Sequence, residues 1–409
     1  MRKVIGLVIL LVILSAFVHI YALPLFRVRF EKPKWDQSPY WIIGRCMGYG
    51  SPIYNDPYRD QIVAIPVNSG VLNPKVYVIH SETQIITGPW VSADYLLIRN
   101  RKRSEHEMVW FSWLDILNNT NPDVFELIYD ELTFGKTRVP PYWLGQNGDR
   151  YLLVNQTTIL SNGELLAAPS EVSAFFSDMH PFQDDWFSVP SIDNKYVILS
   201  YEGSDYLIME TDLSNPRTLS SSEWSDLIWS ASDDVLVGVN HDGFLYELNP
   251  ASPIFSESER VLALPPDFEI TNYDIKAWSN ESGVLIYSSK SEGSHPIALH
   301  ELFALDLNTN TEVYLGQISD LSTVSFIDNQ RLVYWEFLPA NEQSWFEPKK
   351  RQYTMIDPNS QEQVDTVMNL VMFDLTSMQK TIVLNPNWVR LRSTCRFRSD
   401  FMLFENQKG

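Results

Sequence analysis

Basic side chains crowd into two short segments of a chain that is otherwise strongly acidic. The sequence holds 51 Asp and Glu residues against 31 Lys and Arg residues, which gives a formal net charge of −20. Clusters of cations bind acidic protein surfaces or anionic lipid headgroups. The basic clusters are formed by Arg99, Arg101, Lys102 and Arg103, and by Lys349, Lys350 and Arg351. These residues are the first candidates for a binding site.

A second group of residues has the composition of a metal site. Carboxylates beside an imidazole could ligate a metal or share a proton. The four residues lie in the connection before Trp186 and are Asp178, His180, Asp184 and Asp185. The same composition is typical of a solvated loop, and that interpretation stays open beside the metal site.

Common catalytic motifs are absent from the sequence. It contains no G-x-S-x-G elbow, no P-loop, no G-x-G-x-x-G and no H-E-x-x-H. We therefore predict no catalytic residue and no cofactor from the sequence. The acidic balance also disfavours nucleic acid as a partner.

The chain beyond residue 60 is predicted to be all-β. Short runs of Val, Ile, Leu, Tyr and Phe are separated by Asn, Asp, Ser, Gly and Pro, and no long stretch has a helical apolar period. With 44 % apolar residues, the chain can bury a large core.

Tryptophans mark a repeat along this all-β region. A tryptophan precedes a polar turn and an apolar strand again and again, and Trp143, Trp186 and Trp229 follow one another at intervals of 43 residues. Phe326 occurs in the same context. The seven unit-start residues are Trp90, Trp143, Trp186, Trp229, Trp278, Phe326 and Trp388. We interpret these residues as packing groups between neighbouring sheets.

A second repeated pattern lies later in the units. A strand ends in Asp-Leu before a polar turn at Asp212, Asp306 and Asp374. Each unit thus predicts four antiparallel strands, and units of this length are typical of propeller blades. We predict a seven-bladed β-propeller over residues 60–407, with six or eight blades as alternatives.

These repeats resemble those of TolB-type, WD40-like β-propeller proteins. The resemblance rests on the turn followed by an apolar strand and on the Asp-Leu strand ends, and it covers most of residues 90–405. It implies a fold, with extracytoplasmic protein binding as the expected role. The Gly-His pair of true WD repeats is missing.

The basic segments fall in long connections between the second and third strands of their units. Lys349 lies in an insertion from about residue 338 to 368, which also holds Trp345 and Phe346, and a third long connection runs from 289 to 300. Equivalent connections emerge on one face of a propeller, and long loops on a rigid scaffold often carry binding residues. We expect this face to bind an acidic protein or ligand. Alternatively, the charges merely keep hairpin tips soluble.

The two ends of the chain are expected to complete one blade together. We predict that residues 388–393 and 401–405 supply its first two strands, and that residues 76–80 and 84–87 supply its last two. This closure brings Cys46 and Cys395 near each other, which favours a disulfide. Two buried free thiols remain the alternative.

The N-terminus has the pattern of an export signal or membrane anchor. Arg2 and Lys3 precede an apolar stretch from Val4 to Phe26. We expect residues 1–26 to be a signal-anchor helix or a cleaved signal peptide, and residues 27–59 to be a linker. The positive-inside count would instead leave the body in the cytoplasm, but the signal-like pattern favours an extracytoplasmic location.

Together these features predict a propeller that acts as a non-enzymatic binding scaffold, tethered to a membrane or secreted. The alternative is an enzyme acting on glycans or other polymers, with a carboxylate site assembled from several blades in the central channel.

Overall fold

The computed structural model describes most of the chain between residues 33 and 405. The described ranges are 33–49, 59–67, 76–83, 86–87, 95–102, 108–118, 120–128, 141–177, 186–191, 193–201, 205–231, 235–241, 244–251, 260–262, 264, 268, 273–289, 298–320, 322–340, 353–357, 360, 362–385 and 394–405. The expected N-terminal helix over residues 1–26 lies outside these ranges. In the ranges given above, no helix is long and apolar enough to cross a membrane.

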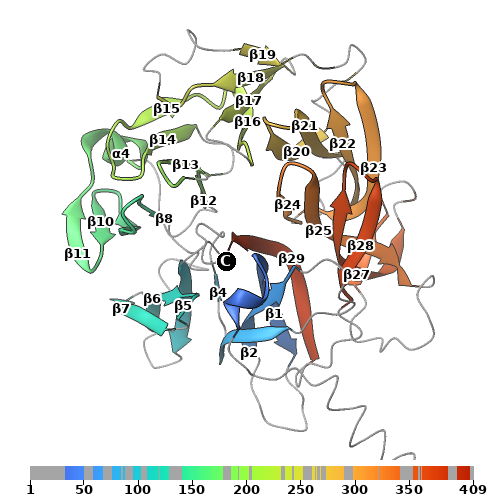
Figure 1. Cartoon of the computed structure of the whole chain (residues 1–409). Helices are drawn as coiled ribbons and strands as arrows, with labels where there is room; N and C mark the ends of the chain where they lie inside the picture. Colours follow the sequence, from blue (N-terminus) through green and yellow to red (C-terminus); the bar gives the residue numbers. More distant parts are fainter. Residues whose placement is uncertain are drawn as a thin grey trace, which may run out of the picture.

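The described residues form seven antiparallel sheets arranged around a common centre (Figure 1). Sheet 1 combines β29 (Thr394–Glu405), β1 (Tyr40–Tyr49), β2 (Arg59–Pro66) and β3 (Tyr77–Thr83). Sheet 2 holds β4 (Ile86–Thr87), β5 (Tyr95–Lys102), β6 (Met108–Asp115) and β7 (Thr120–Ile128). Sheet 3 holds β8 (Tyr142–Leu144), β9 (Arg150–Asn155), β10 (Thr158–Ser161) and β11 (Glu164–Ala167).

The other four sheets continue the same plan in chain order. Sheet 4 holds β12 (Trp186–Pro190), β13 (Tyr196–Tyr201), β14 (Tyr206–Glu210) and β15 (Arg217–Leu219). Sheet 5 holds β16 (Trp224–Trp229), β17 (Leu236–Asn240), β18 (Leu245–Leu248) and β19 (Arg260–Leu262). Sheet 6 holds β20 (Tyr273–Ser279), β21 (Val284–Ser289), β22 (Leu299–Asp306) and β23 (Thr311–Ser319). Sheet 7 holds β24 (Val324–Phe326), β25 (Arg331–Pro339), β27 (Gln363–Asp374), β26 (Tyr353–Ile356) and β28 (Gln379–Leu384).

In each sheet the first strand named lies nearest the centre of the ring (Figure 1). Among the described residues, two short helical elements accompany the strands: the 3-10 turn η2 (Trp35–Gln37) before β1, and the helix α4 (Ser170–Phe175) between sheets 3 and 4. The arrangement confirms the prediction of an all-β propeller.

Apolar side chains fill the spaces between neighbouring sheets. Between sheets 6 and 7, for example, Ile286 and Leu302 pack with Tyr334 and Val371. Sheets 7 and 1 meet in the same way, where Trp335 packs in one cluster with residues of β1 and β29. Each sheet therefore uses both of its faces for burial, which explains why the strands read as nearly continuous apolar runs.

The unit-start residues that the structure describes lie on inner strands. Trp143, Trp186, Trp229, Trp278 and Phe326 belong to β8, β12, β16, β20 and β24. The indole N–H of Trp143 donates to the carbonyl of Thr211 at 3.0 Å, and that of Trp229 donates to the carbonyl of Val189 at 3.0 Å. Val189 belongs to sheet 4, and Thr211 lies in the turn after the third strand of sheet 4. These tryptophans therefore join neighbouring sheets, as predicted. Trp90 and Trp388 lie outside the described residues.

The Asp-Leu strand ends form turns. The Oδ1 atom of Asp306 accepts the backbone N–H groups of Asn308 and Thr309, and that of Asp374 accepts those of Thr376 and Ser377. Asp212 caps the third such turn by accepting the backbone N–H and the hydroxyl of Ser214. Asp306 and Asp374 are the last residues of the third strands β22 and β27, and Asp212 lies two residues after the end of β14, so each aspartate fixes the turn into the fourth strand.

Ring closure differs from the sequence prediction. A single C-terminal strand, β29, pairs along its length with β1, and β1 pairs in turn with β2. The closing sheet thus takes one strand from the C-terminal end and three from the N-terminal end, instead of two from each.

The expected linker over residues 27–59 is wrong where it includes β1, because residues 40–49 form a strand of the closing sheet. The apolar run at Trp41, Ile42 and Ile43 is completely buried, and that burial holds β1 in the ring. Of the segments expected to close the ring, residues 388–393 lie outside the described ranges. Residues 86–87 form β4, which begins sheet 2.

The capped turns predict a specific acid sensitivity. Hydrogen bonds from Ser214 lower the pKa of the Asp212 carboxyl, and those from Ser377 lower the pKa of Asp374. Burial alone would raise the pKa of Asp306, but hydrogen bonds from Thr309 and Asn308 outweigh burial and lower it. A carboxyl whose pKa is depressed on folding contributes stability above its unfolded pKa of about 4 and loses that contribution as the pH falls.

We expect the triple variant Asp212→Asn, Asp306→Asn and Asp374→Asn to show a shallower loss of unfolding free energy below about pH 4 than the parent protein. Urea unfolding at a series of pH values measures this slope. Asp320→Asn, at an exposed position outside these turns, is the control. Equal slopes in the parent and the triple variant would contradict the assignment.

Candidate functional site

The long connections that carry the binding hypothesis all join the second and third strands of their sheets. They are residues 103–107 between β5 and β6, residues 290–298 between β21 and β22, and residues 340–362 between β25 and β27. Because antiparallel strands alternate in direction, equivalent connections in a ring of sheets emerge on the same face. We call this the long-loop face.

Two of these connections are joined at their bases. Ala298 forms a parallel β-bridge with Ile356, which links the end of the 290–298 connection to β26 within the 340–362 insertion. Strand β26 itself pairs with β27, and Met355 is buried. The hydroxyl of Tyr353 donates to the carbonyl of Phe397 on β29 at 2.8 Å. The insertion is therefore fixed to sheets 6, 7 and 1 at once.

The predicted binding residues are placed only in part. The prediction that the first basic cluster follows the second strand is wrong for Arg99, Arg101 and Lys102, because the hydrogen bonds with β6 extend β5 to Lys102. The side chains of these three residues are outside the described part of the chain. Arg103 and the aromatic and basic residues of the insertion, Trp345, Phe346, Lys349, Lys350 and Arg351, are also outside it. The structure thus supports the position of the connections, and the binding role of these side chains stays a prediction.

The predicted metal residues Asp178, His180, Asp184 and Asp185 lie outside the described ranges as well. Within those ranges, no group of three or more His, Cys, Asp or Glu residues could hold a metal ion.

One residue on the long-loop face was not singled out from the sequence. Phe244 follows the turn between β17 and β18 and is 51 % exposed. Its backbone N–H donates to Oδ1 of Asn240, and the ring of His241 contacts the carbonyl of Ser221 at 2.8 Å. The hairpin tip is thus held in place while the phenyl ring is presented to solvent. The sequence feature that could have indicated this exposed ring is an apolar residue directly after the Asp-Gly turn signal.

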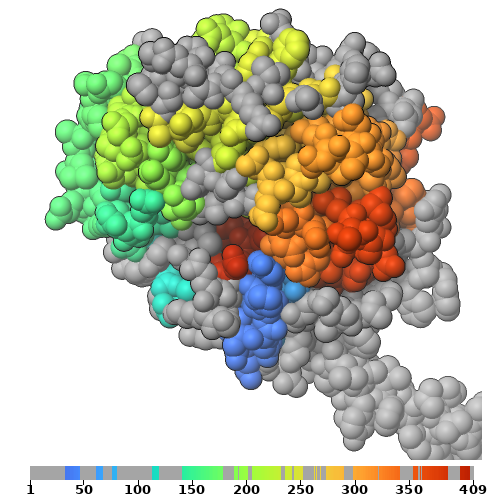
Figure 2. Space-filling model, turned by 45° about the horizontal axis from the view of Figure 1, so that its top comes forward, coloured from blue at the N-terminus to red at the C-terminus, as the bar shows by residue number. Residues whose placement is uncertain are grey.

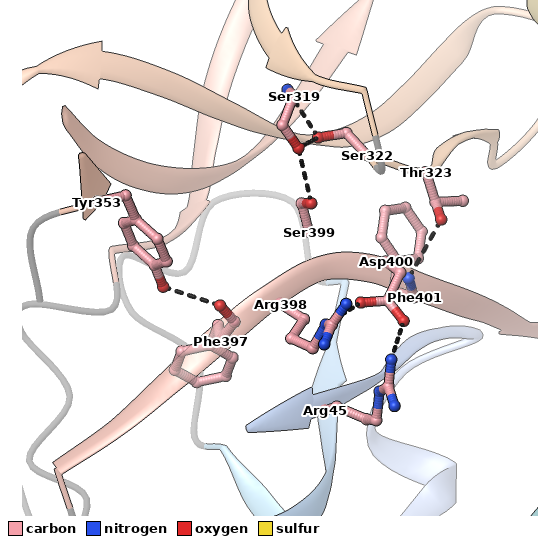
Figure 3. Close-up of polar contacts among 10 residues, drawn as sticks. All are labelled: Arg45, Ser319, Ser322, Thr323, Tyr353, Phe397, Arg398, Ser399, Asp400 and Phe401. Atoms are coloured by element: carbon pink, nitrogen blue, oxygen red, sulfur yellow. Dashed lines mark hydrogen bonds and ion pairs between the residues drawn. The ribbon is translucent and has the colours of Figure 1, made fainter. Parts of the chain in front are cut away.

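The centre of the ring is lined by β29 and its polar contacts (Figure 3). The carboxylate of Asp400 accepts from Arg45 on β1 at 2.9 Å and from Arg398 at 3.2 Å. The side chains of Arg45 and Asp400 are 15 % and 23 % exposed, so water screens their ion pair only weakly. Figure 2 shows residues of this strand at the bottom of a central hollow.

A chain of hydroxyls ties β29 to the connection between sheets 6 and 7. The hydroxyls of Ser319 and Ser322 lie 2.9 Å apart, and that of Ser399 lies 3.0 Å from Ser319 (Figure 3). The backbone N–H of Thr323 donates to the carbonyl of Ser399 at 3.1 Å. These contacts hold β29 in place against the connection between sheets 6 and 7.

Fold and site together define a β-propeller, a scaffold class in which elaborated loops stand on a rigid ring. No family model matches the chain, and no curated protein matches it. Solved structures with a similar arrangement include BamB from Moraxella catarrhalis, with 10 % identity, a TM-score of 0.33, and 67 % of this chain and 90 % of that chain covered.

Two solved structures of enzymes are also similar. The periplasmic gluconolactonase PpgL from Pseudomonas aeruginosa has 12 % identity and a TM-score of 0.39, with 89 % of this chain and 99 % of that chain covered. The oligogalacturonate lyase from Vibrio parahaemolyticus has 9 % identity and a TM-score of 0.39, with coverages of 85 % and 86 %. At this level of similarity these structures carry no information on activity.

The ion pair at the centre predicts a measurable cost when it is broken. We expect Asp400→Asn to lower the free energy of unfolding by about 1–3 kcal/mol, because the mostly buried Arg45 loses its charged acceptor. Urea unfolding measures the change. Asp365→Asn, at an exposed site where the carboxylate accepts from the hydroxyl of Thr354, should stay within about 0.5 kcal/mol of the parent. Similar effects of the two variants would argue against a structural role for the central pair.

Proposed function

We propose that this protein is a non-enzymatic binding scaffold that captures a partner on its long-loop face. In this proposal each of the seven sheets is one blade of a closed propeller. The observation that carries the proposal is the bridge between Ala298 and Ile356, which fixes the bases of two long connections against each other. A preorganised loop base lowers the entropy that binding must overcome.

The chemistry proposed for this face is basic and aromatic. The cluster Arg99, Arg101, Lys102 and Arg103 and the insertion residues Trp345, Phe346, Lys349, Lys350 and Arg351 would supply charge and aromatic contacts, and Phe244 adds an exposed ring. Aromatic and arginine side chains are enriched at interface hot spots. An acidic protein surface is the partner that complements these residues.

The proposal includes an extracytoplasmic location, with residues 4–26 as the membrane tether or signal. Its support is the basic head and apolar run at the N-terminus. It also rests on a disulfide between Cys46 and Cys395, since such bonds persist in oxidising compartments. The register of β1 with β29 places Cys395 opposite Gly48, two residues from the buried Cys46. Among the described residues no cysteine is free.

The alternative enzyme needs two carboxylates about 5–10 Å apart in the central channel. Asp400 is the inner-strand carboxylate that the structure describes most fully, and two arginines engage it. A carboxylate held in this way suits a structural role better than proton transfer, so Asp400 is a poor candidate for the catalytic acid of the alternative.

Replacing the basic cluster tests the binding proposal. We expect Arg101→Ser, Lys102→Ser and Arg103→Ser together to weaken capture of the partner from the host's envelope fraction about tenfold at low salt, with a smaller difference at high salt because ions screen surface charges. Quantitative affinity capture over a salt series measures this. Unchanged capture would refute the role of the cluster.

Three further variants, one test and two controls, locate the surface. Phe244→Ser should weaken capture at every salt concentration, because its contribution is apolar. Leu165→Ser removes a side chain that is 68 % exposed on the outer strand β11 and should have no effect. Lys195→Ser, an exposed cation after β12 on the opposite face, serves as the charge control.

The proposed location has its own test. Non-reducing peptide mapping of protein from its native host should recover the peptides of Cys46 and Cys395 as one linked species that separates on reduction. Two separate thiol-bearing peptides would overturn the extracytoplasmic location but would leave the binding surface in place.

A further inference from the structure

A row of polar side chains lies between sheets 6 and 7, where apolar residues fill the rest of the interface. In sheet 6, Ser288 pairs with Leu302, and Leu302 pairs with Gly316. In sheet 7, Glu336 pairs with Asn369. The two rows face each other, because a Cβ atom built on Gly316 would lie 2.3 Å from Oε1 of Glu336.

A glycine at position 316 is required by this close approach. Its φ of +141° lies in a region that other residues rarely adopt. The pairing register of β22 with β23 also shifts between Leu302 and Phe303, directly beside it. Sheet 6 thus bulges to make room for the Glu336 side chain.

The row, together with His300 two residues before Leu302 on β22, contains buried polar atoms that find no hydrogen-bond partner among the described residues. They are Oγ of Ser288, Nε2 of His300, and both Oδ1 and Nδ2 of Asn369. Ser288 and Asn369 are completely buried, and His300 is 5 % exposed. Buried polar groups in native proteins are almost always hydrogen-bonded to protein or to ordered water.

The ring of His300 is held by one of its two nitrogens. Its Nδ1 lies 2.6 Å from the carbonyl of Ser289. Because a carbonyl can only accept, Nδ1 is the donor in this hydrogen bond. The unpartnered groups are therefore a hydroxyl, an amide with one donor group and one acceptor, and the second imidazole nitrogen.

The charges beside this row favour an uncharged molecule as the group that is bound there. The carboxylate of Glu336 already pairs with the ammonium of Lys380 at 2.5 Å. Burial raises the pKa of the Glu336 carboxyl, although Lys380 opposes the shift. A cation would meet Lys380, and an anion would meet Glu336. A small neutral molecule that both donates and accepts fits the unpartnered groups.

We propose that sheets 6 and 7 enclose a buried hydration site, in which ordered water molecules join Ser288, His300 and Asn369. The site lies at the base of the long-loop face, because His300 is two residues from the bridged Ala298. Water thus cross-links the two sheets at the level where their longest connections begin. This inference does not depend on what the face binds.

A double-mutant cycle tests whether Ser288 and Asn369 share water. We expect Ser288→Ala and Asn369→Leu each to increase the unfolding equilibrium constant, because each leaves the other polar groups without their bridge. The double variant should show a smaller increase than the product of the two, by roughly fivefold or more. Urea unfolding of the full chain gives the three constants.

Ser188→Ala is the matched control for this cycle. Ser188 lies in sheet 4, is 2 % exposed, and its Oγ also finds no partner among the described residues. Combined with Asn369→Leu it should act independently. If the Ser288 pair were equally independent, or if Asn369→Leu made the protein more stable, the row would be dry and the proposal wrong.

A crystal structure gives a second readout. Water density within hydrogen-bond distance of Asn369 and Nε2 of His300 supports the proposal. A fall in the unfolding midpoint on adding a chelator, with density at metal–ligand distances, would identify a metal ion instead and overturn it.

Discussion

The pairing of β29 with β1 is the contact on which the rest of the ring depends. It joins residues 394–405 to residues 40–49, so the last described strand of the chain completes the sheet that the N-terminal part begins. Without it, sheet 7 would pack against an incomplete neighbour, and the shared cluster around Trp335 would lose Phe397 and Phe401. The Arg45–Asp400 ion pair and the hydroxyls of Ser319, Ser322 and Ser399 fix the same strand from two sides.

Much of this architecture was predictable from the sequence, because it follows from local patterns. Inner-strand tryptophans and Asp-Leu turns repeat at nearly regular intervals, and each acts within one or two neighbouring sheets. Trp143 joins two neighbouring sheets and Asp306 fixes a turn, as their local sequence context predicts. The closure was not predictable in the same way, since the pairing of β1 with β29 depends on contacts between distant segments. An apolar run such as Trp41 to Ile43 gives no indication of which strand it joins.

The candidate site was likewise predictable only where it depends on local patterns. Strand order alone places three long connections on one face, and the structure adds the bridge between Ala298 and Ile356, which no local pattern signals. The polar row of Ser288, His300 and Asn369 was equally hidden, because each residue reads as an ordinary strand position. Ser288 and His300 belong to sheet 6 and Asn369 to sheet 7, so only the packing of the two sheets relates them. Sequence reasoning therefore located the face but not the contacts that support it.

Closure by a C-terminal strand has a consequence for biosynthesis. During synthesis, one edge of β1 remains unpaired until residues 394–405 have been made, so the ring cannot close before that point. Contacts of such long sequence separation slow folding.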